Sequence, residues 1–360
     1  MLGAPAVIAS DADANIIEHR RLAVMMAAVT GEGFVSMAAS LSDKNSSAFL
    51  RTPPAACPDD FLALAAGTAP RPMAFVRATG TATLETARDA VAAGLALPLL
   101  VGEAAQIAKD AAAIGWDLAG AEIIDANGEE GAITTAIALV AEGRAAGLVK
   151  GQLHTDVFMG GIVRRASGIR TTRRLVHVFA MVPPDGGRPL LISDAAVNIA
   201  PDVTTRTTAA LEMAALLRRM GIARPRIAVL SATESELPAM PSSIEGAEIA
   251  VAAGAADGAA DFAGPLSFDL AVSPLSASIK GIEGDNPQGR VAGHADAVVV
   301  PDIVAGNVLF KSIVYFAGGL AAGVVLGGRV PIILTSRSDP PAARLASLVL
   351  AAIAGQEEQE

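Results

Sequence analysis

The sequence is poor in aromatic residues and nearly free of cysteine. Of its 360 residues only 3% are aromatic, with a single tryptophan (Trp116) and a single tyrosine (Tyr315). Ala, Val, Leu and Ile must therefore fill the interior, which suits layered α/β proteins. The one cysteine, Cys57, excludes a disulfide bond within this sequence and a cluster of thiolate metal ligands.

Several common functional motifs are also absent. The sequence has no G-x-x-x-x-G-K-[ST] loop, no G-x-G-x-x-G after a predicted strand, no H-E-x-x-H and no G-x-S-x-G. Its four histidines are scattered, and His177 lies in an apolar run where a buried histidine with satisfied hydrogen bonds is expected. The standard nucleotide-binding loops, a zinc site and a serine-hydrolase elbow are therefore not predicted, and no metal ligands are proposed.

Positive charge is scarce, because 27 Lys and Arg face 37 Asp and Glu, a formal net charge of −10. Such a balance disfavours nucleic-acid binding, so an anionic ligand would need a local basic pocket. The N-terminus has no basic region followed by an apolar stretch, and the uncharged segment 312–328 is shorter than the roughly 20 residues of a membrane span. We expect a cytoplasmic protein without nucleic-acid or membrane partners.

What the sequence does contain is a regular alternation of short apolar runs and helical segments from Pro70 onward. Strands are expected at 73–76, 97–101, 122–125 and 147–150, with helices at 84–93, 103–114 and 132–142 between them. This alternation is typical of βαβ units in a mainly parallel sheet. Residues 1–55 lack steady periodicity and are interpreted as an N-terminal extension.

The second half begins with two apolar runs, 176–182 and 190–193, that are separated by PPDGGR and predict an antiparallel pair. The further expected elements are a helix at 203–220, a strand at 227–231, a helix through 256, a strand at 269–273, a helix to 282, a strand at 297–300, a helix at 304–316 and a strand at 324–326. At this length two lobes with a cleft between them are expected.

The stretch VPIILTSRSD (330–339) reads as a buried strand over 330–335, followed by a polar cluster and then a helix to Ala354. Ligands of open α/β sheets bind at the carboxyl ends of such strands, which makes Ser336, Arg337 and Asp339 candidate site residues. A polar cluster that only caps the next helix fits the local pattern equally well, so both interpretations stay open.

Similar polar clusters follow other apolar runs, and several together favour one shared site. Taken individually, Asp194 and Asp302 fit better as helix caps or turn formers. The candidates for substrate binding are Lys150, Thr155, Asp194, Asn198, Asp302, Asn307 and Lys311.

Six segments together resemble the phosphate acetyltransferase and phosphate butyryltransferase family. They are KGQLHTD (150–156), GIRTTRRLVHVF (168–179), LLISDAAVNIAPD (190–202), GPLSFDLAVS (264–273), ADAVVVPDIVAGNVLFK (295–311) and VPIILTSRSD (330–339). The sequences of the segments around Lys150 and at 170–179 are most similar to the acyltransferase portion of fused enoyl-CoA hydratase/phosphate acetyltransferase proteins.

The resemblance implies two three-layer α/β domains with mainly parallel sheets and a cleft between them, as in isocitrate and isopropylmalate dehydrogenases. The implied division gives residues 56–168 with 326–360 to the first domain and 169–325 to the second. It also implies a homodimer and reversible transfer of an acyl group between coenzyme A and inorganic phosphate, directly within a ternary complex. Coenzyme A is then a substrate, and no cofactor is expected.

In this scheme Ser336 donates a hydrogen bond to the carbonyl oxygen or orients the phosphate, and Arg337 holds the phosphate. The proposed base of the acetyltransferase branch is an aspartate seven residues after this serine, a position that is Ala343 here. The nearest carboxylate is Asp339, as in the butyryltransferase-like pattern, which makes Asp339 the candidate base. Acetyl is favoured over butyryl as the donor group. The alternatives are a phosphate butyryltransferase, a non-catalytic acyl-CoA or phosphate-binding protein, and a metal-dependent dehydrogenase on a related fold.

Overall fold

The computed structural model describes residues 49–334 and 339–356. Most of the predicted N-terminal extension (1–55) lies outside the described residues, as do Ser336 and Arg337. Residues from Arg51 onward belong to one compact unit. Among the described residues, no helix combines the length and the apolar character that crossing a bilayer requires.

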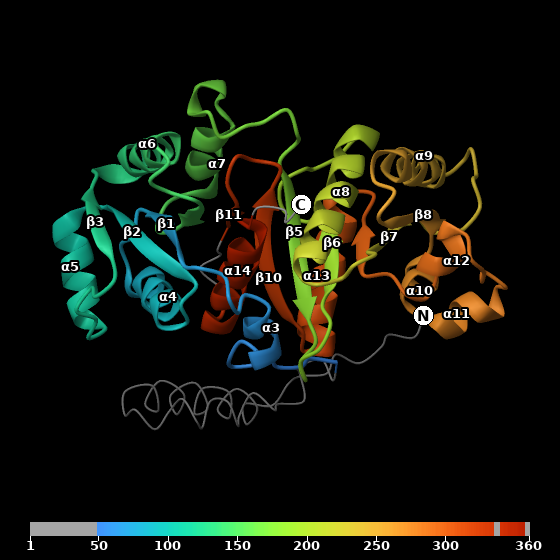
Figure 1. Cartoon of the computed structure of the whole chain (residues 1–360), viewed down its shortest axis with the longest axis horizontal. Helices are drawn as coiled ribbons and strands as arrows, with labels where there is room; N and C mark the ends of the chain where they lie inside the picture. The colour runs from blue at the N-terminus through green and yellow to red at the C-terminus, as the bar shows by residue number, and fades with distance from the viewer. Residues whose placement is uncertain (1–48, 335–338, 357–360) are drawn as a thin grey trace, which may run out of the picture. The chain divides into compact units, whose positions relative to one another are not determined.

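Within the described residues, eleven strands form one sheet in the order β3-β2-β1-β4-β11-β10-β5-β6-β9-β7-β8. They are β1 (Arg71–Val76), β2 (Ala96–Gly102), β3 (Glu122–Asp125), β4 (Leu148–Lys150), β5 (Val176–Val182), β6 (Leu190–Ser193), β7 (Arg226–Leu230), β8 (Asp261–Leu266), β9 (Ala297–Val299), β10 (Leu320–Leu326) and β11 (Ile332–Ile333). Figure 1 shows β3 and β8 at the two ends of this sheet.

The pairings are parallel towards both ends of the sheet and antiparallel in its middle. The pairs β11–β10, β10–β5 and β5–β6 are antiparallel, and the other pairs of neighbouring strands run parallel. The predicted α/β class with a mainly parallel sheet is confirmed, and so is the antiparallel pair 176–182 with 190–193. The middle strands join both halves into one continuous sheet. The division into domains 56–168 plus 326–360 and 169–325 stays a prediction.

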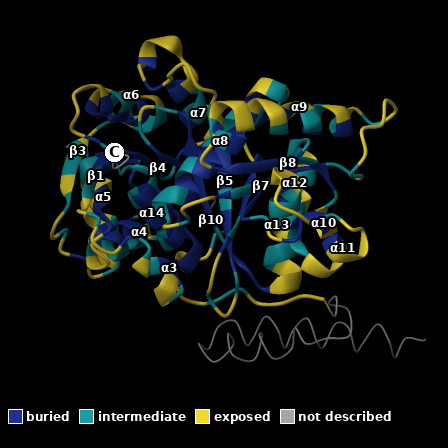
Figure 2. Cartoon of the chain, turned by 45° about the vertical axis from the view of Figure 1, so that its right-hand side comes forward, coloured by how far each residue is buried: buried dark blue, intermediate teal, exposed yellow. Residues whose placement is uncertain are grey.

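Helices cover both faces of the sheet. They are α3 (Asp59–Ala63), α4 (Thr81–Ala92), α5 (Ala104–Ala113), α6 (Gly128–Ala141), α7 (Thr155–Val163), α8 (Val203–Arg219), α9 (Pro241–Ala256), α10 (Phe268–Val272), α11 (Pro274–Ile279), α12 (Pro287–Val291), α13 (Ile303–Ala317) and α14 (Pro341–Ala354), with the 3-10 helix η1 (Arg165–Ser167) after α7. Figure 2 shows the central strands buried and the outer sides of the helices exposed.

The apolar core differs between the two faces of the sheet. On one face a single cluster extends from α4 across α14 and α8 to α9. On the other face there are two clusters, one under α6 and α7 at the β1–β4 end and one under α10, α12 and α13 towards β7 and β9. Side chains alternate between faces along a strand, so on β10 Leu320, Ala322 and Val324 join the single cluster while Ala321 and Gly323 face the other side. Small residues on that side leave room between its two clusters.

Two sequence-based expectations about elements are wrong. The sequence predicts a strand at 269–273, but these residues belong mainly to helix α10. The strand in this region is β8, which begins seven residues before α10. This strand was not predicted because it contains Asp261, Gly264 and Pro265, and these residue types are depleted in strand interiors. β8 is an edge strand of the sheet, where Pro is tolerated. Arg224 and Arg290 pair with the buried Asp261 and hold the pKa of that carboxyl well below its usual value. The strand expected at 330–335 is shorter, spanning Ile332–Ile333.

Candidate active site

A cavity of about 870 Å³ lies at the middle of the sheet, on the face that carries two core clusters. His177 and Phe179 of β5 and Ala321 and Gly323 of β10 form its floor. Leu153 comes from the α7 side, whereas Phe310 and Val314 come from α13. The cavity is therefore bounded by both clusters, and the small side chains of β10 leave it unfilled.

Five of the predicted site residues line this cavity. Lys150 ends β4, Thr155 begins α7, Asn307 and Lys311 lie on α13, and Asp339 precedes α14. These residues come from four separate segments, which supports the prediction that the polar clusters share one site. Leu334 and Asp339, the described residues on either side of 335–338, both line the cavity. Ser336 and Arg337 lie outside the described residues, so their predicted roles stay predictions.

Three other predicted site residues do not line the cavity and make local structural contacts. Asp302 caps α13, because its Oδ1 accepts hydrogen bonds from the backbone N–H groups of Val304 and Ala305 at 2.9 Å. Asp194 is buried and accepts from the N–H of Ala196 and of Val197, each at 2.9 Å.

Asn198 completes this local structure. Its Nδ2 donates to Asp194 Oδ2 at 2.7 Å and to the carbonyl oxygen of Leu175 at 2.8 Å. These contacts are the cap and turn roles that the sequence favoured for Asp194 and Asp302. The predicted substrate contacts of all three residues stay predictions.

The cavity concentrates positive charge in an acidic protein. Lys150 and Lys311 bring two ammonium groups to the cavity. Among the described lining residues, Asp339 supplies the one carboxylate. Lys150 is buried, and Lys311 Nζ lies 5.8 Å from the ring centroid of Phe310. Lys311 is exposed, so it is for Lys150 that burial strengthens the interaction with an anion, since the surrounding dielectric constant is low. The cavity thus supplies the local basic pocket that an anionic ligand requires.

Aromatic rings line the floor and the α13 side of the cavity. Phe179 stacks on Phe310 with ring centroids 4.3 Å apart and an interplanar angle of 24°, and His177 lies 4.3 Å from Phe179. His177 is only 1% exposed, and its Nδ1 has no hydrogen-bond partner among the described residues. Burial lowers the pKa of His177 to about 4, although the nearby Asp194 carboxylate acts in the opposite direction. His177 is therefore neutral at pH 7. Its predicted burial is confirmed, whereas the expected satisfaction of its ring nitrogens is not, since Nδ1 has no partner among the described residues.

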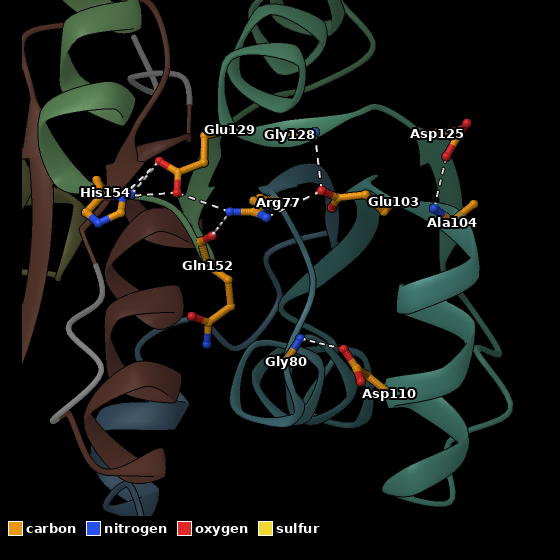
Figure 3. Close-up of polar contacts among 10 residues, drawn as sticks. All are labelled: Arg77, Gly80, Glu103, Ala104, Asp110, Asp125, Gly128, Glu129, Gln152 and His154. Atoms are coloured by element: carbon orange, nitrogen blue, oxygen red, sulfur yellow. Dashed lines mark hydrogen bonds and ion pairs between the residues drawn. The ribbon is translucent and has the colours of Figure 1, made fainter.

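A second polar group lies beside the cavity, at the carboxyl ends of β1, β2 and β4, and was missed by the sequence reasoning (Figure 3). Glu129 near the start of α6 accepts hydrogen bonds from the backbone N–H of His154 at 3.0 Å and from Arg77 at 3.1 Å. Glu129 also lies 3.0 Å from Nδ1 of His154, which lines the cavity. These contacts, and above all the backbone N–H of His154, lower the pKa of Glu129.

Arg77 holds this group in place. Its guanidinium lies 3.4 Å from Glu103 and donates to the carbonyl oxygen of Gln152 at 3.2 Å. Arg77 has φ of +52°, a left-handed conformation that costs free energy in a residue with a side chain. The sequence signal that could have identified this group is the position of its members, because Arg77, Glu103 and Gln152 each follow a parallel strand of one sheet.

No three His, Cys, Asp or Glu side chains within residues 49–334 and 339–356 come together as a metal ion would require. The cavity and the neighbouring polar group therefore offer hydrogen-bond donors, cations and one histidine–carboxylate pair. Such a set can bind an anionic substrate and transfer a proton.

Comparison with known proteins gives consistent matches over most of the chain. The family model described as phosphate acetyl/butaryl transferase matches residues 129–352. A phosphate acetyltransferase from Rhizobium meliloti is 40% identical over 297 residues, which cover 82% of this chain and 92% of that protein. A phosphate butyryltransferase from Clostridium acetobutylicum is 31% identical over 272 residues, which cover 75% of this chain and 88% of that protein.

Solved structures show the same architecture. The crystal structure of a branched-chain phosphotransacylase from Enterococcus faecalis V583 matches with a TM-score of 0.66 and 26% sequence identity. The match covers 80% of this chain and 100% of that chain. A phosphotransacetylase from Streptococcus pyogenes shares the fold, with a TM-score of 0.68 over 82% of this chain.

Proposed function

The chain belongs to the phosphate acetyl/butyryl transferase family, and on that premise we propose that it transfers a short acyl group reversibly between coenzyme A and inorganic phosphate. Acetyl-CoA and phosphate give acetyl phosphate and free coenzyme A, by direct transfer within a ternary complex. Coenzyme A is a substrate in this scheme, and no cofactor takes part. The proposal includes a homodimer in the cytoplasm, as the family resemblance implies.

The observation that carries the proposal is the meeting of Lys150, Thr155, Asn307, Lys311 and Asp339 at one cavity. Phosphate oxygens accept hydrogen bonds from ammonium, hydroxyl and amide groups, and charge-assisted bonds of this kind are the strong ones. Two lysines at one cavity also favour the negative charge that develops on the acyl carbonyl oxygen during transfer. The apolar wall of Phe179 and Phe310 suits the acyl group and the uncharged arm of coenzyme A.

In this mechanism, Ser336 donates a hydrogen bond to the acyl carbonyl oxygen or to the phosphate. Arg337 pairs with phosphate through its planar guanidinium, which matches two phosphate oxygens at once. Asp194, Asn198 and Asp302 support the loops behind the cavity through the hydrogen bonds described above.

Relatives named for acetyl transfer match this chain at identities such as 40% and 33%, and relatives named for butyryl transfer at identities such as 36% and 31%. These identities overlap, and the match at 40% is the observation that favours acetyl as the donor group. A phosphate butyryltransferase is the alternative within the same reaction class.

The test is release of free coenzyme A thiol from acetyl-CoA and from butyryl-CoA, each with and without inorganic phosphate. We expect phosphate-dependent release by the wild type, faster with acetyl-CoA, and its loss in Arg337→Ala. No phosphate-dependent release from either donor, together with measurable acyl-CoA binding, would favour the non-catalytic binding protein. Binding of NAD by the wild type would favour the dehydrogenase alternative.

A further inference from the structure

Acyl transfer to coenzyme A requires a base, because a free thiol with a pKa near 8.5 is mostly protonated at pH 7. The titratable side chains that line the cavity among the described residues are Lys150, His154, His177, Lys311, Tyr315 and Asp339. Tyr315 is a phenol, and a phenol hydroxyl is a weak proton acceptor. The two lysines are cations, and His177 is 1% exposed on the floor. Ala343 contributes only a methyl group to the same cavity. The choice of base is thus between His154 and Asp339.

We propose that His154, oriented by Glu129, is the general base that accepts the thiol proton of coenzyme A. This inference rests on the proposed acyl transfer. It assigns a catalytic role to His154, which faces the cavity, and a positioning role to Glu129, which acts through His154.

The geometry around His154 selects one tautomer of its ring. Nδ1 lies 3.0 Å from Oε1 of Glu129 and 3.1 Å from Oε2. A carboxylate can only accept hydrogen bonds, so Nδ1 carries the hydrogen and Nε2 keeps its lone pair. The backbone N–H of His154 donates to the same carboxylate at 3.0 Å, which fixes the main chain as well as the ring. An imidazole held in this way is ready to accept a proton at Nε2.

Glu129 is itself held in place from the other side. Arg77 Nη1 lies 3.1 Å from Glu129 Oε1, and Glu103 lies 3.4 Å from the same guanidinium (Figure 3). The hydrogen bonds from His154 and the charge of Arg77 lower the pKa of Glu129, so it stays ionised. A fixed anion stabilises the imidazolium that forms when His154 takes a proton.

Accessibility separates His154 from His177. The His154 side chain is 69% exposed and borders the cavity, whereas His177 is 1% exposed and sits beneath Phe179. A base must come within hydrogen-bond reach of the proton that it removes. The His154 side chain borders the cavity, with Nδ1 anchored on Glu129 and with no hydrogen bond to Nε2 among the described residues.

In the proposed step the acyl group passes from phosphate to the sulfur of coenzyme A. Nε2 of His154 takes the proton of the coenzyme A thiol, the sulfur attacks the carbonyl carbon of the acyl phosphate, and a C–S bond forms. The bond between that carbon and the bridging phosphate oxygen then breaks, and the proton passes from the imidazolium to the departing phosphate. In the opposite direction the imidazolium donates its proton to the departing sulfur, as microscopic reversibility requires.

Several charged groups face His154 and contribute to the pH dependence of the step. Glu129 and Arg77 lie on the α6 and β1 sides, and Asp156 lies on α7 itself. Lys150, Lys311 and Asp339 line the same cavity. Positive charges such as those of Arg77, Lys150 and Lys311 disfavour a nearby imidazolium, whereas carboxylates favour one.

The test measures kcat and KM from pH 5 to 9 in both directions, with acetyl phosphate plus coenzyme A and with acetyl-CoA plus inorganic phosphate. The variants are His154→Ala, His154→Gln, Glu129→Gln and Asp339→Asn, and His294→Ala is the matched control because His294 is exposed and does not line the cavity. Unfolding midpoints for all variants verify the fold.

For coenzyme A acylation we expect His154→Ala to lower kcat by about 10²–10³-fold with little change in KM, and to remove the acid limb of the pH profile. Added imidazole restores part of that loss. Glu129→Gln lowers kcat by roughly 10-fold and moves the acid limb to lower pH, because the negative charge beside the ring is gone. His294→Ala behaves as the wild type.

An acid limb that persists in His154→Ala but disappears in Asp339→Asn would overturn the assignment and make Asp339 the base. A kcat within about threefold of the wild type in both His154 variants would overturn it as well. If the wild type itself shows no phosphate-dependent transfer, the proposed function fails and this inference fails with it. Loss of the base alone leaves that wild-type reaction intact, so the two failures are distinguishable.

Discussion

The carboxylate of Asp194 accepts a hydrogen bond from the backbone N–H of His177 at 2.9 Å, and so connects the turn after β6 to strand β5. The same carboxylate accepts hydrogen bonds from the N–H groups of Ala196 and Val197 and from Asn198. His177 and Ala196 both line the cavity. Asp194 therefore fixes the cavity floor from behind, without lining the cavity.

We predict that Asp194→Ala lowers the free energy of unfolding by about 2–3 kcal/mol, because it leaves buried donors without an acceptor. Denaturant unfolding measures the change, and Asp302→Ala, which removes one helix cap, is the comparison with an expected loss of about 1 kcal/mol. A variant with unchanged stability but a raised KM would instead support the predicted substrate contact of Asp194.

Stability should depend on pH through His177. Its pKa is lowered from 6.5 to about 4 in the folded protein, so the unfolded chain binds more protons between these two values. The stabilising contribution of the neutral ring is present above pH 6.5 and is lost as the pH falls towards 4. The unfolding midpoint of the wild type should decrease through this window, and that of His177→Asn should decrease less.

The measurement is thermal unfolding at half-unit steps from pH 8 to 4. Equal decreases in the wild type and in His177→Asn above pH 4.5 would contradict the role of His177. Carboxyl groups with lowered pKa values, such as Asp202 and Glu103, act at lower pH, because their contribution is lost only as the pH falls through those values.

Gly323 sits where a larger residue would collide with the cavity floor. A Cβ at this position would lie 3.0 Å from Cε1 and Nε2 of His177 and 3.1 Å from Cε1 of Phe179. We predict that Gly323→Ala destabilises the protein by roughly 1–3 kcal/mol. Gly254→Ala is the matched control, because a Cβ there meets nothing within 4 Å, and it should stabilise α9 by up to about 1 kcal/mol. Equal unfolding midpoints for the two variants would contradict this reading of the floor.

Lys311 should contribute to substrate binding through its charge. We predict that Lys311→Ala raises the KM for inorganic phosphate by about 10-fold or more, in line with the roughly 1.5–3 kcal/mol of a hydrogen bond to a charged group. Steady-state kinetics with acetyl-CoA checks this, and the exposed Lys109 on α5 supplies the control Lys109→Ala. The same KM in all three proteins would remove Lys311 from the phosphate site.

Cys57 should react slowly with thiol reagents. Burial and, to a smaller extent, the charges of Asp60 and Asp59 together raise its pKa to about 11, so the reactive thiolate is scarce at pH 8. We expect alkylation of the native protein by iodoacetamide to be at least about 100-fold slower than that of the unfolded chain, as followed by mass spectrometry. Rapid labelling of the native protein would show that α3, which Cys57 precedes, opens readily.

Local sequence patterns determined most of the elements. The runs 176–182 and 190–193 coincide with β5 and β6, because short continuous apolar runs and a Pro/Gly turn between them act over a few neighbouring positions. β8 was missed because Asp261 is stabilised by Arg224 and Arg290, which are distant in sequence and become its partners only after folding. The periodicity of a short segment contains no information about such partners.

For the candidate site, the sequence alone identified Lys150, Thr155, Asn307, Lys311 and Asp339 as polar residues after apolar runs, and the family resemblance gave them a chemistry. Only the tertiary structure decided that these five share one cavity, that Asp194 and Asn198 support it from behind, and that Glu129 orients His154. The physical reason is that side-chain periodicity is local, whereas the order of strands in a sheet is set by burial and pairing between distant segments.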